Sequence, residues 1–164
     1  MAGCEQLNLV CSCSLFAVGI AFTSYANMVA TRPRETAFKR VLKVMPLKTE
    51  VKIEGPFGNL RLHNDAKRTA VFLAGGIGVT PFRSILLDAA HRKLPQYIFI
   101  FFSNHRPEDA PFLNELQSLE KQNPNYKFIG TMTQVGRSKL PWHGELGYIN
   151  TDNRHRAFIL SFEL

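Results

Sequence analysis

The second half of the chain alternates apolar, β-prone runs with amphipathic helical segments, and this pattern constrains the fold more than any other feature. The runs Thr69–Ala74, Tyr97–Ser103 and Tyr126–Met132 are almost continuously apolar or β-branched, as strands buried on both faces are. Between them, Pro81 to Lys93 and Pro107 to Gln122 carry apolar residues at helical spacing. The order strand, helix, strand, helix, strand predicts an α/β fold with a parallel sheet, right-handed crossovers and helices on both faces.

The first junction from strand to helix reads TAVFLAGGIGVTPFRS and contains three glycines. Gly75, Gly76 and Gly78 remove Cβ atoms where the chain turns sharply, which lets a ligand approach the backbone. Thr80 is predicted as the N-cap of the next helix and Pro81 as its first residue. The free N–H groups and the helix dipole would suit a pyrophosphate. A tight turn needed only for packing remains the alternative.

Two familiar phosphate-binding motifs are absent from this junction. A Walker A loop needs Gly-Lys-Ser/Thr, which does not occur here. The common dinucleotide fingerprint would run from Gly76 through Gly78, but it meets Pro81 where a third glycine should stand. The motif predicts nucleotide binding through a different glycine turn.

The second strand is followed by Ser103-Asn-His-Arg106, where NAD-preferring sites usually place an acidic residue for the ribose 2′-hydroxyl. The first acids, Glu108 and Asp109, come only after Pro107. A hydroxyl and a guanidinium at this place favour a 2′-phosphate, and so NADP(H) over NAD(H). Alternatively, Arg106 is a solvated loop residue and the two acids complement the helix dipole.

The first half of the chain has shorter elements. We expect a strand over Met28–Arg32, a helix within Arg34–Val44 with Thr36 as N-cap, and a strand over Glu50–Glu54 followed by a turn at Gly55–Gly58. The polar stretch from Leu62 to Arg68 reads as a linker between two unlike halves.

Composition limits the classes of partner and compartment. Lys and Arg number 20 against 13 Asp and Glu in 164 residues, without a long run of like charge. This surplus suits an acidic protein or a phosphorylated ligand, whereas nothing interleaves aromatic and basic residues as nucleic-acid binding would need. The three cysteines, Cys4, Cys11 and Cys13, lack zinc-site companions, and their confinement to the first 13 residues favours a reducing compartment.

The apolar stretch Leu15–Phe22 resembles an export signal only weakly. Glu5 stands where positive charge should precede such a signal, and the stretch is too short to span a bilayer. We therefore expect a cytoplasmic protein with no membrane association, while a weak export signal or anchor stays the alternative.

Two longer stretches resemble a known family. AGGIGVTPFRSIL and the later FFSNHRPEDAPFLNEL resemble the NAD(P)-binding half of the ferredoxin–NADP⁺ reductase superfamily, while TAFKRVLKVMPLKTEVKIEGPFGNL resembles the end of its flavin-binding β-barrel. The resemblance implies a partial antiparallel barrel over residues 28–64 and an incomplete NAD(P)-binding domain over 65–149. Residues 1–27 and 150–164 stay unassigned, so the chain looks like the middle of a reductase truncated at both ends. The barrel's Arg-x-Tyr/Phe-Ser motif has only a partial counterpart in Ala21-Phe-Thr-Ser24, which lacks the arginine.

The resemblance also implies a function and its residues. It implies an oxidoreductase in which NAD(P)H gives hydride to bound FAD and the electrons pass to an acceptor such as ferredoxin, an acidic iron–sulfur protein. No side chain need act as acid or base, and no metal site is expected. The alternative is a nucleotide-binding fragment or subunit without flavin or activity of its own. The residues implied are Gly76, Gly78, Thr80 and Pro81 for NAD(P), and Thr36, Ala37 and Phe38 for the flavin pyrophosphate.

Overall fold

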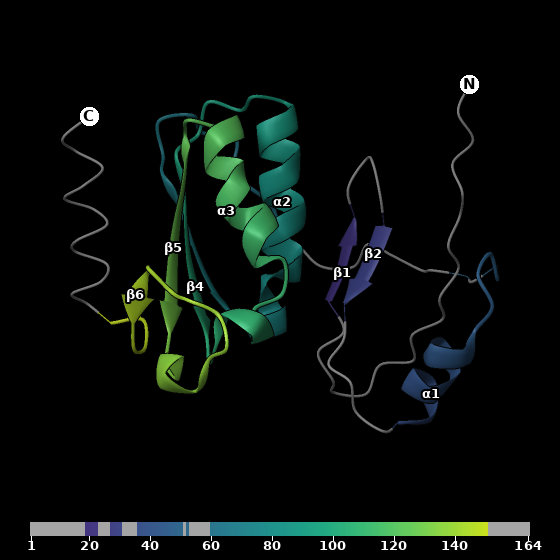
Figure 1. Ribbon diagram of the computed structural model, residues 1–164. Helices are drawn as coiled ribbons and strands as arrows, with labels where there is room; N and C mark the ends of the chain where they lie inside the picture. The colour runs from purple at the N-terminus through teal and green to yellow at the C-terminus, as the bar shows by residue number, and fades with distance from the viewer. Residues whose placement is uncertain (1–18, 23–26, 31–35, 51, 53–59, 151–164) are drawn as a thin grey trace.

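The structure is a computed structural model that describes residues 19–22, 27–30, 36–50, 52 and 60–150 (Figure 1). It contains a two-stranded hairpin, a separate short helix and a four-stranded sheet with two helices. Most of the strand predicted over 50–54 and the whole turn predicted at 55–58 lie outside the described residues.

The four-stranded sheet is parallel and confirms the predicted α/β fold class. Its strands are β3 (Ala70–Gly75), β4 (Ile98–Asn104), β5 (Tyr126–Met132) and β6 (Glu145–Leu146), which lie side by side in that order. The first three match the predicted strands to within one residue at either end. The sequence did not reveal β6, because two residues are too few to form a recognisable apolar run.

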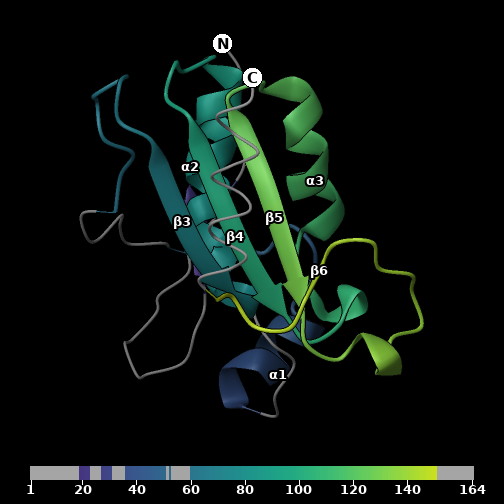
Figure 2. The same ribbon diagram turned by 90° about the vertical axis from the view of Figure 1, so that its left-hand side faces the viewer.

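Helices α2 (Thr80–His91) and α3 (Leu113–Gln122) contact each other and cover the same face of the sheet (Figures 1 and 2). Right-handed crossovers that step in one direction across a sheet place successive helices on one side. No described helix covers the opposite face, where Ile149 packs against Phe99 and Phe101. The described part therefore shows helices on one of the two faces on which they were predicted.

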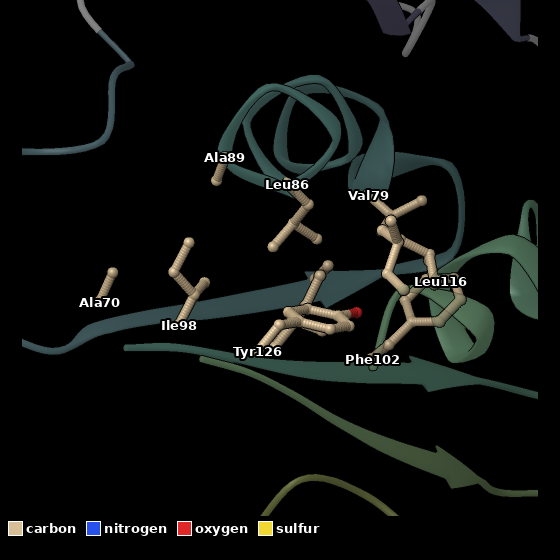
Figure 3. Close-up of a cluster of buried hydrophobic side chains, with 11 residues drawn as sticks. Ala70, Val79, Leu86, Ala89, Ile98, Phe102, Leu116 and Tyr126 are labelled. Carbon is tan, nitrogen blue, oxygen red and sulfur yellow. The ribbon is translucent and has the colours of Figure 1, made fainter. Parts of the chain in front are cut away.

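The main core lies between this sheet and the two helices. Side chains from β3, β4 and β5 meet those from α2 and α3, and the close-up shows Leu86 and Ala89 above Ile98 and Tyr126 (Figure 3). The cluster consists of Ala70, Ala74, Val79, Leu86, Ala89, Ile98, Ile100, Phe102, Leu116, Leu119 and Tyr126. This packing holds the carboxyl ends of the strands and the starts of the helices in fixed positions.

The segment predicted as one helix from Pro107 to Gln122 is divided. A 3-10 turn, η2 (Pro107–Asp109), precedes α3, and Phe112 lies between them in the left-handed region with φ of 60°. The Arg83 side chain of α2 lies 4.7 Å from the Phe112 ring centroid and forms a bidentate ion pair with Glu115 at 2.6 and 2.7 Å. These contacts join the two helices near their starts, and neither propensity nor spacing in the sequence predicted them.

The first half contributes the hairpin and the short helix. Strands β1 (Gly19–Phe22) and β2 (Asn27–Ala30) pair antiparallel, and β1 lies against α2. Helix α1 (Ala37–Val44) begins after Thr36, whose Oγ1 accepts a hydrogen bond from the Lys39 N–H at 3.4 Å. The predicted N-cap is thereby confirmed, whereas β1 falls in a region for which the sequence predicted no strand.

Within the described residues, no helix combines the length and the apolar character needed to cross a membrane.

Candidate nucleotide-binding site

The register of the sheet brings the ends of three strands to one edge. Gly75 of β3 pairs with Ser103 of β4, and Ser103 pairs with Thr131 of β5. In open parallel sheets, ligands bind outside the carboxyl ends of the strands. The glycine turn and the polar segment after β4 therefore lie at the edge where a nucleotide site is expected.

The glycine turn is a short 3-10 helix, η1 (Gly76–Val79), that leads from β3 directly into α2. Gly76 has φ of 50°, a conformation that glycine adopts without the steric cost of a Cβ. A Cβ at Gly78 would meet no atom within 4 Å, and one at Gly75 would come no closer than 3.9 Å to the Ser103 carbonyl oxygen. The positive φ thus explains Gly76, whereas neither backbone conformation nor packing among the described residues explains Gly78.

Thr80 is not the N-cap that the sequence predicted. Its φ and ψ of −53° and −48° are helical, its side chain is fully buried, and its hydroxyl donates to the Ile77 carbonyl. Val79 precedes the helix instead, and Pro81 is the second helical residue rather than the first. The prediction was wrong because η1 continues into α2, so the turn closes with a backbone bond from the Thr80 N–H to the Ile77 carbonyl.

The electrostatics of the turn suit an anion. The first N–H groups of a helix lack partners within it, and the dipole adds partial positive charge there. Neither η1 nor the first turn of α2 contains an acidic residue. The backbone from Gly76 to Gly78 therefore presents donors without a carboxylate that would repel a phosphate.

Arg106 is already paired with carboxylates in this structure. Two guanidinium nitrogens, Nε and Nη2, bind Asp109 at 2.6 and 3.0 Å, and the third, Nη1, lies 3.7 Å from Glu108. The hydrogen bond to Asp109 and the charge of that carboxylate raise the pKa of Arg106. Ser103 is half-buried at the strand end. A 2′-phosphate at Arg106 would have to replace Asp109 or share the guanidinium with it.

The loop after β5 reaches the same edge, which the sequence analysis missed. His105 Nδ1 lies 2.9 Å from the Thr133 hydroxyl, and the Glu108 carboxylate accepts bonds from the Ser138 hydroxyl at 2.7 Å and the Lys139 N–H at 3.2 Å. The bond from Ser138 is the main cause that lowers the pKa of Glu108. Polar residues directly after the strand, in TMTQ, were the available signal.

The flavin residues predicted in the first half lie at the start of α1. Thr36 caps the helix, while the N–H groups of Ala37 and Phe38 belong to the first turn, where donors have no partner within the helix. This arrangement can accept an anion, and the assignment to a flavin pyrophosphate stays a prediction.

A cavity of about 530 Å³ lies between α3, β5 and the segment 140–144. Trp142 lines it, and the indole occupies the space beside Gly130, where a Cβ would lie 2.7 Å from the ring. None of the predicted site residues lines this cavity. Among the described residues, no three His, Cys, Asp or Glu side chains are grouped to hold a metal ion.

Comparison with known proteins decides the family. The family model described as the oxidoreductase NAD-binding domain matches residues 72–161. The chain belongs to this family. The match begins within β3 and contains the glycine turn, so the segment that the family shares includes the one that forms the candidate site.

Several curated relatives of this chain are named as reductases. Reductase component 1 of terephthalate 1,2-dioxygenase from Comamonas sp is 27% identical over 65% of this chain and 32% of its own length. An NADH-cytochrome b5 reductase-like protein from Emericella nidulans is 31% identical over 66% and 22%. Ferredoxin–NADP reductase B from Sorangium cellulosum is 25% identical over 75% and 49%. The matched part of the chain thus spans from about a fifth to about a half of these relatives.

Solved structures show the same fold. The Amycolatopsis cytochrome P450 reductase matches with a TM-score of 0.62 and 18% identity over 95% of this chain and 47% of its own length. The flavohemoglobin of Malassezia yamatoensis, solved with bound FAD and heme, matches with a TM-score of 0.61 and 20% identity over 80% and 34%. The resemblance to the ferredoxin–NADP⁺ reductase superfamily inferred from the sequence is confirmed.

Proposed function

We propose that the glycine turn binds the pyrophosphate of NAD(P)H and that the chain is the nucleotide-binding part of a flavin-dependent oxidoreductase. The observation that carries the proposal is Gly78, where a Cβ would meet no atom of the described residues within 4 Å. A glycine in the turn that no contact within the described residues requires fits the approach of a ligand to the backbone.

The chain's own residues bind and orient the nucleotide in this proposal. Backbone N–H groups of Gly76 to Gly78 donate to the pyrophosphate, while the hydroxyl of Thr80 holds the turn through the Ile77 carbonyl. Pro81 continues the turn into α2, which packs firmly on the sheet. The Cα atom of Gly75 and the side chain of Ser103 would line the path of the nucleotide along the strand ends.

FAD is the second proposed cofactor, with its pyrophosphate at Thr36, Ala37 and Phe38. A bound flavin would accept hydride from the nicotinamide and release electrons singly. The names of the relatives, reductase components and a ferredoxin–NADP reductase, support an acceptor protein as partner. The formal net charge of +7 would steer an acidic carrier such as a ferredoxin.

In this proposal Arg106 and Ser103 bind the 2′-phosphate, so NADPH would bind more tightly than NADH. Arg106 can bind a phosphate in bidentate fashion. Its pairing with Asp109 and Glu108 reduces the affinity gained from a 2′-phosphate, because the phosphate competes with carboxylates that already bind the guanidinium. We therefore expect a modest preference for NADPH over NADH.

Two titrations test the proposal on the whole chain. Calorimetric titration with NADPH and with NADH measures binding at the turn, and binding of neither would refute the proposal. Incubation with excess FAD, removal of unbound flavin and a visible absorption spectrum then measure flavin retention. A retained band that NADPH bleaches supports the reductase. Nucleotide binding without a retained band would instead mean a nucleotide-binding part that lacks flavin of its own.

A further inference from the structure

One buried polar side chain at the candidate site has no bonding partner for its nitrogen. Asn104, the last residue of β4, is 8% exposed, and its Nδ2 is buried without a hydrogen bond among the described residues. Its backbone carbonyl is satisfied, because the Thr133 N–H donates to it at 3.0 Å. A buried amide nitrogen without a partner costs free energy, and a bound ligand that accepts its hydrogen bond would remove that cost.

The position of Asn104 on the strand places its side chain under the glycine turn. Side chains alternate along a strand, so Asn104 shares the helix-covered face with Phe102. Phe102 packs in the same cluster as Val79, at the end of η1, and Leu116 of α3 (Figure 3). Asn104 lies two residues, roughly 7 Å, further toward the carboxyl edge.

The register places Asn104 next to the turn along the sheet as well. Gly75 is the last residue of β3 and pairs with Ser103, so Asn104 stands one step beyond that pair, on the Gly76 side. Segment η1 also contacts β4 directly. Asn104 therefore stands at the strand end beside the first residues of the turn, and its side chain is on the face of the sheet that α2 and α3 cover.

We infer that Asn104 is a further binding residue of this site, whose Nδ2 donates to a phosphate oxygen of the bound dinucleotide. The inference rests on the proposed function. The group that lacks a partner is a donor, and it stands beside backbone donors in a turn without acidic residues, so its complement is an anionic oxygen.

The test compares stability with affinity in Asn104→Ala. Because the amide nitrogen is unsatisfied in the free protein, its removal should leave the urea midpoint unchanged or higher. The Kd for NADH should rise roughly thirtyfold, the effect of one lost hydrogen bond to a charged group. ADP-ribose, which keeps the pyrophosphate but lacks nicotinamide, should lose the same factor. Asn104→Asp should bind still more weakly, because a carboxylate then faces the phosphate.

Thr131→Val is the matched control. The Thr131 hydroxyl is also buried without a partner among the described residues, but Thr131 follows Ile129 on the opposite face of the sheet. Its replacement should leave the Kd for NADH unchanged, which separates loss of a contact from loss of any buried polar group near the strand ends.

Three outcomes would overturn the inference. A lower urea midpoint in Asn104→Ala with unchanged Kd would show a structural role. A loss confined to NADH would place the contact at the nicotinamide. Unchanged affinity in Asn104→Ala, alongside weakened NADH binding in Gly78→Val, would remove Asn104 and leave the proposed function intact. A wild-type chain that binds no nucleotide would instead refute the proposed function itself.

Discussion

Gly78→Val separates the two explanations of the glycine turn, packing and ligand approach. A Cβ at Gly78 meets nothing within 4 Å, and the residue does not have positive φ. The substitution therefore costs the free protein almost nothing, and the better helix propensity of valine adds roughly 0.5 kcal/mol of stability. If the turn serves only packing, the variant should bind NADPH and NADH with wild-type affinity.

The two explanations predict different nucleotide affinities for the variant. A β-branched side chain at this position would push the pyrophosphate away from the backbone donors of the turn. Loss of one hydrogen bond to a charged phosphate costs about 2 kcal/mol, which corresponds to roughly a thirtyfold rise in Kd. Calorimetric titration with NADPH and NADH measures this change, and urea unfolding of the free protein checks that the fold is intact.

Gly136→Val is the matched control for that experiment. Gly136 lies in another 3-10 turn, η3 (Val135–Arg137), and a Cβ there also meets nothing within 4 Å. The control should therefore alter affinity far less than Gly78→Val does. Wild-type affinity in a fully folded Gly78→Val protein would refute the assignment of the turn to the pyrophosphate.

Three further substitutions test other parts of the structure. Arg106→Ala should raise the Kd for NADPH more than that for NADH, and equal losses in parallel titrations would show that Arg106 does not contact the 2′-phosphate. Tyr126→Phe should raise the free energy of unfolding in urea by about 1 kcal/mol, because the phenol oxygen is buried without a partner among the described residues. Burial also raises the pKa of Tyr126, so the neutral phenol is the form removed; a lower midpoint would reveal a bond made by that hydroxyl. Glu115→Gln should lower the free energy of unfolding by about 2 kcal/mol, since it leaves the buried Arg83 without its carboxylate; an unchanged urea midpoint would mean that solvent replaces the pair.

The position of the glycine turn was predictable because its signals are local. Glycines before Thr-Pro mark a turn after a strand, and parallel strands bring their carboxyl ends to one edge whatever the details of packing. The capping of α1 by Thr36 was also predictable, because the Thr36 hydroxyl forms its hydrogen bond within one helical turn. The sequence predicted no role for Asn104, because an asparagine at a strand end indicates nothing until the burial of its amide is known.

The sequence by itself determined the order of strands and helices, the parallel sheet, the family and the position of the glycine turn. These follow from hydrophobic periodicity and from residue types with restricted backbone choices, which act over a few residues. Tertiary structure decided the features that depend on packing and on distant partners. Arg106 is paired with carboxylates, and Thr80 lies within the helix because η1 continues into α2. Helices α2 and α3 cover the same face of the sheet. Tertiary packing also decided the loop after β5 that bonds to Glu108 across 30 residues. Such contacts are set by how the strands align and how the helices cross over them, and no local pattern encodes either.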